Sequence, residues 1–466
     1  MNDNIFREYD IRGIAGKEID GETFEFIGKG LGTFVRDVFN GDKVIVARDC
    51  RLTSKEYAGR VIDGLRWTGC NVIDIGMAPT PVLYFAIFKY LPNGKDIGAV
   101  ITASHNPKEF NGIKMRSTNQ FIFGKRIQQI KEMIKNKSFV KAENFGLHSK
   151  RDVIDAYVED ILGRVSLKRK LKVVVDTGNG TTGPIIKRIL DRMDCDVTYL
   201  FIEPDGNFPN HLADPTVPKY TVEIRKKVVE LKADIGLALD GDGDRIGVID
   251  DKGELINADI LLAILARDYL KRHPGEPVAY DVKCSISLIE EIKKNGGKPV
   301  ISATGYPLVQ QKMWEVGANL GGEMSGHIYI KDNYYGFDDG ILSGLRLLEI
   351  LSKTKEKFSD IVATIPKYIS TEEIRLEFKD ECKNKDDEKF RIMKELRPYF
   401  EKQDGELIDI DGYRLNYDYG WGLVRASNTQ PILVVRFEAK TQKQLDYIKN
   451  IFRKKLSEYK AVKIDF

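Results

Sequence analysis

The amino-acid sequence predicts an α/β protein in which three related α/β domains, with mixed, largely parallel sheets, precede a smaller α+β domain. Three observations support this fold class. Apolar runs alternate with amphipathic stretches through about the first 355 residues, a pattern typical of strands covered by helices. Two of the apolar runs are alike, DIGAVI from Asp96 and DIGLAL from Asp234. The alternation ends after about Lys367, where the smaller domain is expected to begin.

The first domain reads as a β-α-β-α-β series. Its predicted elements are a strand KVIVARD from Lys43, a helix from about Thr53, a strand NVIDIG from Asn71, a helix from Pro79 to Leu91 and a strand DIGAVITAS from Asp96. The pattern restarts at LKVVVD from Leu171 and again at PVAYDVK from Pro277. We therefore predict α/β domains over residues 1–150, 151–252 and 253–366.

Residues 367–466 are predicted to form the α+β domain. A charged run, KDECKNKDDEK from Lys379, precedes a helix around Phe390 to Phe400. Strand-like RLNYDYGWGLVRAS and PILVVRFEAKT follow, and an amphipathic helix begins at Gln442. Such a charged run is typical of a solvated surface.

Composition narrows the possible partners. The N-terminus, MNDNIFREYD, lacks the apolar core of a secretory signal, and no apolar run is long enough to span a bilayer. A net charge of +3 on 466 residues argues neither for nor against a nucleic-acid or membrane partner. The five cysteines are odd in number, scattered and without CxxC spacing, which favours a reducing cytoplasm over a disulfide or zinc protein.

The stretch ALDGDGDRIGVID places three carboxylates on alternate residues, Asp240, Asp242 and Asp244. Carboxylates this close repel one another unless a cation lies among them. A calcium-binding EF-hand loop needs glycine at its sixth position and glutamate at its twelfth, where this chain has Arg245 and Asp251. A compact loop of hard oxygen ligands after a strand instead predicts Mg²⁺, which shares its ligands with substrate phosphates.

A second motif is ITASHNPKEFNGIKM, in which Ser104 and His105 follow an apolar strand and Lys114 lies ten residues further on. A helix-capping serine and a Ser-His-Asp triad are alternatives, but no GxSxG elbow surrounds Ser104. Beside a metal and lysines, Ser104 fits a phosphate carrier better.

Two further loops carry recognition chemistry. In GGEMSGH, Glu323 and Ser325 pair an acceptor with a donor on a glycine-flexible loop, which suits sugar hydroxyls. In RASNTQP, Arg425 is followed by Ser427, Asn428 and Thr429, a cluster of donors that reads as an anion cradle.

A competing motif is DTGNGTTG, where Gly178, Gly180 and Gly183 form a GxGxxG between a strand and a helix, with Glu203 about twenty residues further on. It supports an NAD-dependent oxidoreductase as an alternative. The favoured interpretation is structural: the glycines form a tight turn that packs a helix against a sheet, and the function is carried by the other loops.

Together the motifs resemble the α-D-phosphohexomutase superfamily, in its order and over essentially the whole chain. They are YDIRG from Tyr9, TASHNP from Thr102, DGDGDR from Asp240, GEMSGH from Gly322 and RASNTQP from Arg425. The GEMSGH form resembles the phosphomannomutase/phosphoglucomutase group, whereas phosphoglucosamine mutases typically carry Gln where Met324 stands. The resemblance implies four domains around a central cleft and an interconversion of hexose 1- and 6-phosphates. The reaction would use a phosphoserine and a hexose 1,6-bisphosphate.

The resemblance also implies roles for the motif residues. Ser104 would carry the phosphate and, with the three aspartates, hold Mg²⁺. The implied catalytic residues are Ser104, His105, Lys114, Arg12 and Arg245. The implied substrate-binding residues are Tyr9, Lys283, Tyr306, Glu323, Ser325, His327, Arg425, Ser427, Asn428 and Thr429. Tyr306 stands where relatives often have histidine, so an acid/base role is lost there and Lys283 becomes the more credible partner.

The expected partners are small hexose phosphates, with no nucleic acid and no membrane, and the chain is expected to act as a monomer or homodimer. Phosphoglucosamine mutase activity and a non-catalytic phosphosugar-binding protein stay open as alternatives.

Overall fold

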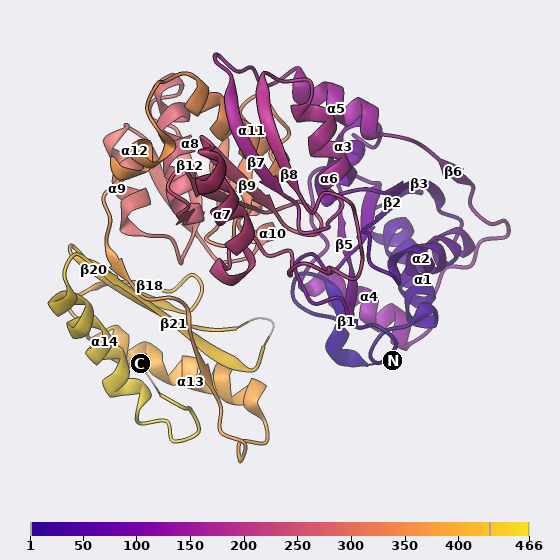
Figure 1. The fold of residues 1–466 in the computed structure, drawn as a ribbon. Coiled ribbons are helices and arrows are strands. Elements are labelled where there is room, and N and C mark those ends of the chain that lie inside the picture. The colour runs from indigo at the N-terminus through magenta and orange to yellow at the C-terminus, as the bar shows by residue number, and fades with distance from the viewer. Residues whose placement is uncertain (1, 428–429, 465) are drawn as a thin grey trace.

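A computed structural model describes residues 2–427, 430–464 and 466. Four sheet-based domains lie along an arc in chain order, with the first domain and the N-terminus at one end and the fourth domain at the other (Figure 1). The predicted fold class is confirmed: three domains are mixed α/β sheets with helices, and the fourth sheet is antiparallel. The exact domain bounds stay a prediction.

The first domain is built on a six-stranded sheet of order β1-β5-β4-β2-β3-β6. Its central strands β4, β2 and β3 run parallel, and β5 and β1 are antiparallel additions at one edge. In chain order its elements are η1 (Asp3–Ile5), β1 (Ile11–Ile14), α1 (Gly21–Val38), β2 (Lys43–Arg48), α2 (Ser54–Trp67), β3 (Asn71–Met77), α3 (Thr80–Tyr90), β4 (Ile97–Ile101), β5 (Phe110–Arg116), α4 (Lys125–Lys135) and β6 (His148–Lys150).

The second domain has a five-stranded sheet of order β11-β10-β9-β7-β8. Its strands β9, β7 and β8 are parallel, and β10 and β11 are antiparallel to their neighbours. In chain order its elements are α5 (Ile154–Leu162), β7 (Leu171–Asp176), α6 (Gly183–Leu190), β8 (Cys195–Leu200), η2 (Pro218–Tyr220), α7 (Val222–Leu231), β9 (Ile235–Leu239), β10 (Ile246–Asp250) and β11 (Leu255–Ile256).

The third domain has a four-stranded sheet of order β13-β12-β14-β15, in which only the β14–β15 pair is antiparallel. In chain order its elements are α8 (Ala258–Arg272), β12 (Pro277–Asp281), α9 (Ile286–Lys294), β13 (Lys298–Ser302), α10 (Tyr306–Val316), β14 (Leu320–Gly322), β15 (Ile328–Ile330), α11 (Gly340–Ser352) and α12 (Phe358–Ala363).

These three sheets share one topology, which confirms that the domains are related. The four-strand orders β5-β4-β2-β3, β10-β9-β7-β8 and β15-β14-β12-β13 are equivalent. In each, the third strand in chain order runs parallel to the first and then reverses into an antiparallel partner. The three reversing loops are those that carry Ser104, Asp240 and Glu323. The repeated topology therefore places one polar loop of each domain at the carboxyl end of an equivalent strand.

The fourth domain is an antiparallel sheet of order β16-β21-β20-β19-β18, with β17 also paired to β21. In chain order its elements are β16 (Ile369–Ser370), β17 (Ile374–Glu377), α13 (Lys385–Phe400), β18 (Glu406–Ile408), β19 (Tyr413–Tyr417), β20 (Gly420–Ala426), β21 (Ile432–Ala439) and α14 (Gln442–Leu456). The final helix begins where the sequence predicts it, and Thr441 caps it by accepting a hydrogen bond from the backbone N–H of Gln444.

The helix before it begins earlier than predicted. The charged run was expected to precede a helix near Phe390, but α13 already begins at Lys385. Its first turn contains three acidic residues, Asp386, Asp387 and Glu388, whose negative charges interact favourably with the positive end of the helix dipole. Among the described residues, no helix is both long and apolar enough to cross a bilayer.

The cores explain how the domains are joined. One apolar cluster is continuous through the first three domains and includes Leu83, Val173 and Leu262. The fourth domain has a core of its own, and a small cluster of Val282, Trp421 and Leu423 links it to the third domain. Because burial of apolar surface is the main source of cohesion, the first three domains are bound to one another much more strongly than to the fourth.

Candidate active site

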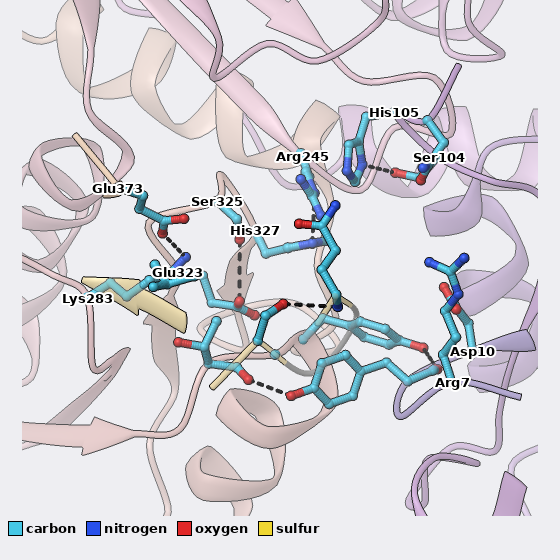
Figure 2. A pocket seen from close by; sticks show the side chains of 18 of the residues that line it. Arg7, Asp10, Ser104, His105, Arg245, Lys283, Glu323, Ser325, His327 and Glu373 are labelled. Atoms are coloured by element: carbon cyan, nitrogen blue, oxygen red, sulfur yellow. Dashed lines mark hydrogen bonds and ion pairs between the residues drawn. The ribbon is translucent and has the colours of Figure 1, made fainter. Parts of the chain in front are cut away.

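A cavity of about 380 Å³ lies where loops of all four domains meet (Figure 2). It brings together every described residue predicted to be catalytic or substrate-binding: Tyr9, Arg12, Ser104, His105, Lys114, Arg245, Lys283, Tyr306, Glu323, Ser325, His327, Arg425 and Ser427. Asn428 and Thr429 lie outside the described residues. Four charged side chains that were not predicted from the sequence also line the cavity: Arg7, Asp10, Glu373 and Arg375. Basic groups outnumber acidic ones, so the cavity suits an anionic ligand.

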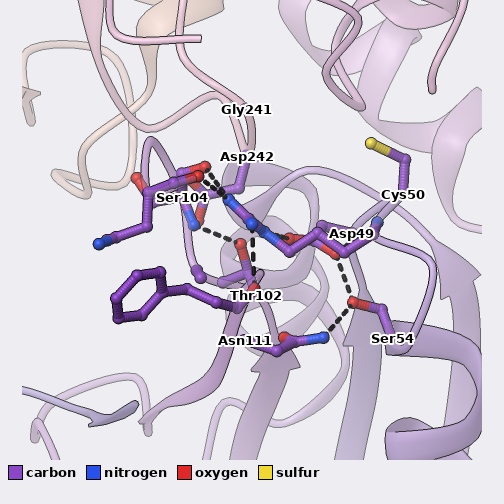
Figure 3. Close-up of polar contacts among 12 residues, drawn as sticks. Asp49, Cys50, Ser54, Thr102, Ser104, Asn111, Gly241 and Asp242 are labelled. Atoms are coloured by element: carbon purple, nitrogen blue, oxygen red, sulfur yellow. Dashed lines mark hydrogen bonds and ion pairs between the residues drawn. The ribbon is translucent and has the colours of Figure 1, made fainter. Parts of the chain in front are cut away.

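Ser104 is buried at the end of β4 with a left-handed backbone, φ +51°. Thr102 stabilises this conformation, since its Oγ1 accepts the backbone N–H of Ser104 at 2.9 Å (Figure 3). The Ser104 hydroxyl donates to Asp240 Oδ2 at 2.6 Å. A Cβ on Gly241 would lie 2.6 Å from the Ser104 carbonyl oxygen, so only glycine permits this approach of the two loops.

Arg51 organises the Ser104 loop from behind and was not predicted. Its buried guanidinium donates to the carbonyl oxygens of Ser104 at 2.9 Å and Pro107 at 2.7 Å, and Asp49 pairs with its Nε at 3.1 Å. The available signal was its position in ARDCR, directly after a buried strand. Polar residues at the carboxyl ends of parallel strands face the ligand side of such sheets.

The predicted metal-binding aspartates form one cluster behind Ser104. Asp240, Asp242 and Asp244 are buried, and one ligand oxygen from each lies within 4.8 Å of the others. Burial and the two neighbouring carboxylates raise the pKa of Asp240 well above its ordinary value. Such a cluster is costly without a compensating cation.

Lys114 supplies part of that compensation. Its Nζ on β5 lies 2.8 Å from Asp242 Oδ2 and also binds Asp244. Burial opposes the charge of both partners. Their attraction prevails, so the pKa of Lys114 is raised and that of Asp242 is lowered. Lys114 is therefore a protonated donor in the site.

The cluster fits a divalent cation. Within the described part of the chain, Asp242 Oδ1 and Asp244 Oδ1 are buried without a hydrogen-bond donor. Buried carboxylate oxygens are rarely left in this state. Three carboxylates and the Ser104 hydroxyl form the all-oxygen set that Mg²⁺ prefers, with positions left over for a phosphate.

His105 and Arg12 lie on the cavity side of Ser104. His105 Nδ1 is 3.0 Å from Ser104 Oγ. Burial, with the nearby Arg245 and Arg12, lowers the pKa of His105 well below its ordinary value, so the imidazole is neutral. Arg12 donates to the Ala103 carbonyl oxygen at 3.3 Å and also binds Asn106 and Asp10. These contacts hold it beside the serine.

The GEMSGH loop presents Glu323 and Ser325 as predicted. Ser325 donates to Glu323 Oε2 at 3.3 Å, and Tyr329 donates to Oε1 at 2.6 Å. Burial raises the pKa of Glu323. The pair is thus a preformed donor and acceptor at the cavity wall.

His327 holds Arg245 in place. Arg245 Nε donates to His327 Nε2 at 2.9 Å, and His327 Nδ1 lies 2.9 Å from Asp338 Oδ2. Because arginine has only donors, His327 Nε2 must be an acceptor, and the ring proton sits on Nδ1. The sequence predicted His327 as a binding residue but not this positioning contact.

Tyr306 makes an interdomain contact that the sequence did not predict. Its hydroxyl donates to the Tyr9 carbonyl oxygen at 3.1 Å, and the Tyr9 hydroxyl donates to the Thr304 carbonyl oxygen at 2.8 Å. Burial raises the pKa of Tyr306, so its hydroxyl keeps its proton. The loss of a histidine acid/base role at this position stays a prediction.

Two acids of the fourth domain reach the basic groups of the cavity. Lys283 Nζ pairs with Glu373 at 2.7 Å across the boundary between the third and fourth domains (Figure 2). Arg425, on β20, donates from Nε to Asp411 Oδ2 at 3.0 Å. Burial opposes the charge of Arg425, but Asp411 more than offsets this and raises its pKa.

One residue of the charged run is not solvated, contrary to expectation. Lys389 is 3% exposed, and its Nζ donates to the carbonyl oxygens of Ser427 at 2.8 Å and Gln430 at 3.0 Å. The i, i+3 spacing places Asp386 within 2.6 Å of the same ammonium. The apolar stem of a lysine can be buried while its charge binds carbonyl oxygens, which composition alone does not reveal.

The GxGxxG glycines pack against protein. A Cβ on Gly183 would lie 1.8 Å from the Ile202 carbonyl oxygen, and one on Gly180 would lie 2.7 Å from that of Gly241. The Thr181 N–H donates to the same Gly241 oxygen at 3.0 Å. This geometry supports the interpretation of the turn as the backing of the aspartate loop.

Fold and site together define a phosphohexomutase-type enzyme, with three copies of one α/β topology and a fourth domain enclosing a cationic cavity beside a serine. Four segments match the descriptions phosphoglucomutase/phosphomannomutase alpha/beta/alpha domains I, II and III and C-terminal domain, over residues 3–141, 155–253, 257–368 and 373–455. The chain belongs to the phosphoglucomutase/phosphomannomutase family.

Full-length relatives agree. A phosphomannomutase/phosphoglucomutase of Pseudomonas putida is 43% identical over 98% of this chain and 96% of its own. A phosphoglucomutase of Neisseria gonorrhoeae is 38% identical over 97% and 96%. The crystal structure of a phosphoglucomutase/phosphomannomutase family protein from Burkholderia thailandensis superimposes with a TM-score of 0.91, at 40% identity and 99% coverage of both chains.

Proposed function

We propose that this protein interconverts hexose 1-phosphates and hexose 6-phosphates of mannose, glucose or both. It would do so through a phosphorylated Ser104 and a hexose 1,6-bisphosphate. The observation that carries the proposal is the Ser104 hydroxyl, hydrogen-bonded at 2.6 Å to Asp240 within the three-aspartate cluster and open to a cationic cavity.

The two half-reactions are phosphoryl transfers between Ser104 Oγ and a sugar oxygen. In the first, the bond from phosphorus to Ser104 Oγ breaks while a bond to the free sugar hydroxyl forms, and the proton lost by that hydroxyl ends on Ser104 Oγ. In the second, Ser104 Oγ forms a bond to the other phosphorus of the bisphosphate, the bond from that phosphorus to its sugar oxygen breaks, and the proton lost by the Ser104 hydroxyl ends on that sugar oxygen. Asp240 and His105 Nδ1 both lie within hydrogen-bond distance of that hydroxyl. Lys114 and Arg12 stabilise the charge on the transferred group.

The metal proposed for this site is Mg²⁺, held by Asp240, Asp242, Asp244 and an oxygen at Ser104. When bound, it neutralises negative charge that develops on the transferred phosphoryl group. The orphaned oxygens of Asp242 and Asp244, within the described residues, support this assignment.

The rest of the cavity supplies recognition. Glu323 and Ser325 present one acceptor and one donor to sugar hydroxyls, which suits either orientation of the ring. Arg425 and Ser427, with Asn428 and Thr429 next to them in sequence, would hold the phosphate that is not reacting. Tyr9, Lys283, Tyr306 and His327 complete the proposed binding set, and Arg245 lies on the catalytic side.

Mannose and glucose phosphates are favoured because relatives named for one or both sugars cover nearly the whole chain. Glucosamine phosphate is the alternative, disfavoured by Met324. An NAD-dependent oxidoreductase is disfavoured because Gly180 and Gly183 are packed against backbone. A non-catalytic phosphosugar-binding protein would need neither the serine nor the carboxylate cluster. Domain bounds near residues 150, 252 and 366, a monomer or homodimer and a cytoplasmic location complete the proposal.

A coupled assay of mannose, glucose and glucosamine 1-phosphates side by side tests this function. We expect turnover of mannose or glucose 1-phosphate that requires Mg²⁺ and a hexose 1,6-bisphosphate, and none in Ser104→Ala. Preference for the glucosamine substrate would favour the alternative mutase. Absence of turnover together with sub-millimolar NAD(H) binding in calorimetry would favour the oxidoreductase.

A further inference from the structure

We infer that Asp411 is a positioning residue that orients Arg425 towards the non-reacting phosphate, and that docking of the fourth domain on the third fixes Asp411 in that position. The inference rests on the proposed function of Arg425 as a phosphate-binding residue.

One carboxylate oxygen makes both contacts. Asp411 Oδ2 accepts from Arg425 Nε at 3.0 Å, within the fourth domain, and from the Thr304 backbone N–H at 3.1 Å, in the third domain. The side chains of Asp411 and Arg425 are only 13% and 10% exposed. Two donors fix the position of Asp411 Oδ2 more tightly than either donor alone. Docking therefore restricts the Asp411 carboxylate and, through it, the Arg425 guanidinium.

The Thr304 peptide also extends the connection to the first domain. Its carbonyl oxygen accepts from the Tyr9 hydroxyl at 2.8 Å, while its N–H binds Asp411. The two polar groups of one residue thus join the first and fourth domains. The position of Asp411 therefore depends on the arrangement of three domains around the cavity.

The backbone beside Asp411 is shaped for this contact. Gly412 has φ +80°, and a Cβ there would lie 2.2 Å from the Val424 carbonyl oxygen and 2.7 Å from Arg425 Cα. Only glycine adopts this conformation in this space without strain. The loop is thereby pressed on the β20 backbone, next to the residue whose side chain Asp411 holds.

The contact leaves a useful set of donors. Asp411 engages Arg425 at Nε, so with respect to the described residues the terminal nitrogens remain available to form two parallel hydrogen bonds with a phosphate. The attachment of the fourth domain does not depend on Asp411. Arg414 donates to the Cys284 carbonyl oxygen at 2.9 Å, and Glu438 accepts the Ile286 N–H at 2.9 Å. Loss of Asp411 should therefore disturb the orientation of Arg425 more than the docking.

A double-mutant cycle tests the inference on the full-length enzyme. We would measure kcat and KM for mannose 1-phosphate in the parent, Asp411→Ala, Arg425→Ala and the double variant. In Asp411→Ala we expect KM to rise about tenfold and kcat to change much less. The reason is that the weakened contact, between Arg425 and the non-reacting phosphate, contributes to substrate binding and not to the transfer itself. If Asp411 acts through Arg425, the double variant should be no worse than Arg425→Ala.

Matched variants separate positioning from a structural effect. Asp409→Asn removes an acid two residues away that pairs with the exposed Arg397, and it should leave KM unchanged. Asp411→Asn keeps one acceptor oxygen and should fall between the parent and Asp411→Ala. It also replaces Asp411→Ala in the cycle if circular dichroism shows that the alanine variant does not fold.

Two outcomes would overturn the inference. Additive losses in the double variant would show that Asp411 acts independently of Arg425. An equal or lower KM without the carboxylate would show that it competes with the phosphate. The same double-mutant cycle is measured on the binding of inorganic phosphate by calorimetry. If the parent shows no mutase turnover, the proposed function is wrong, but the binding cycle still tests the role of Asp411.

Discussion

Replacing Lys389 with methionine should weaken both the fourth domain and its phosphate-binding loop. The ammonium donates to the carbonyl oxygens of Ser427 and Gln430, on either side of the loop. A hydrogen bond to a charged group contributes about 1.5–3 kcal/mol, which sets roughly 3–6 kcal/mol for two. The cost of burying the ammonium offsets part of this, so we expect a loss of about 2–4 kcal/mol in unfolding free energy. Methionine fills nearly the same volume, which avoids a cavity.

The assay has two readouts, urea unfolding followed by circular dichroism and KM for mannose 1-phosphate. Lys389→Met should shift the unfolding midpoint down and raise KM about tenfold or more. Lys394→Met, on the exposed face of the same helix, is the matched control and should change neither. If Lys389→Met keeps the stability and KM of the parent, the ammonium does not support the loop and the reasoning from its burial is wrong.

Three further outcomes are expected. Ser104→Ala should remain unphosphorylated after incubation with a hexose 1,6-bisphosphate, and a phosphopeptide elsewhere in the chain would assign the carrier to another residue. Asp242→Asn should lower turnover by orders of magnitude while the fold survives, whereas activity that persists in EDTA would contradict a metal in this cluster. Burial raises the pKa of Asp339 to about 6, from 3.8 for an unfolded carboxyl, so the folded state binds this proton more tightly. The contribution of Asp339 to stability should therefore fall as pH rises from about 4 to about 6. Asp339→Asn should flatten that part of the stability profile in urea titrations, and an unchanged profile would refute this.

The chemistry-bearing loops could be predicted because each is contiguous and follows an apolar strand. Ser104, Asp240 and Glu323 stand at the ends of equivalent strands, and the carboxyl ends of such strands meet on one side of their sheets. The alternation of apolar and amphipathic segments likewise predicted three related domains, because it reflects strands covered by helices.

The supporting residues could not be predicted, because their partners are distant in sequence. Lys389 looks like any lysine in a charged run until its burial against the loop at Ser427 is known. Asp411 meets the Thr304 N–H only through the docking of two domains. Arg51 reaches the Ser104 carbonyl oxygen across 53 residues, so its position after a buried strand indicates the ligand side of the sheet but not its partner.

The backbone of Gly241 lies directly against the backbone of Ser104. This contact determines the smallest fragment of the protein in which the Ser104 loop can keep its conformation. Gly180 is pressed in turn against Gly241, and Gly206 against the backbone of Arg51, so loops of the first two domains stack backbone on backbone. A fragment that ends after the first sheet would carry Ser104 without the surface that shapes it. The reacting centre is thus a unit larger than one domain and smaller than the chain. In a reconstitution from two fragments, the first cut that can preserve it lies beyond the second sheet.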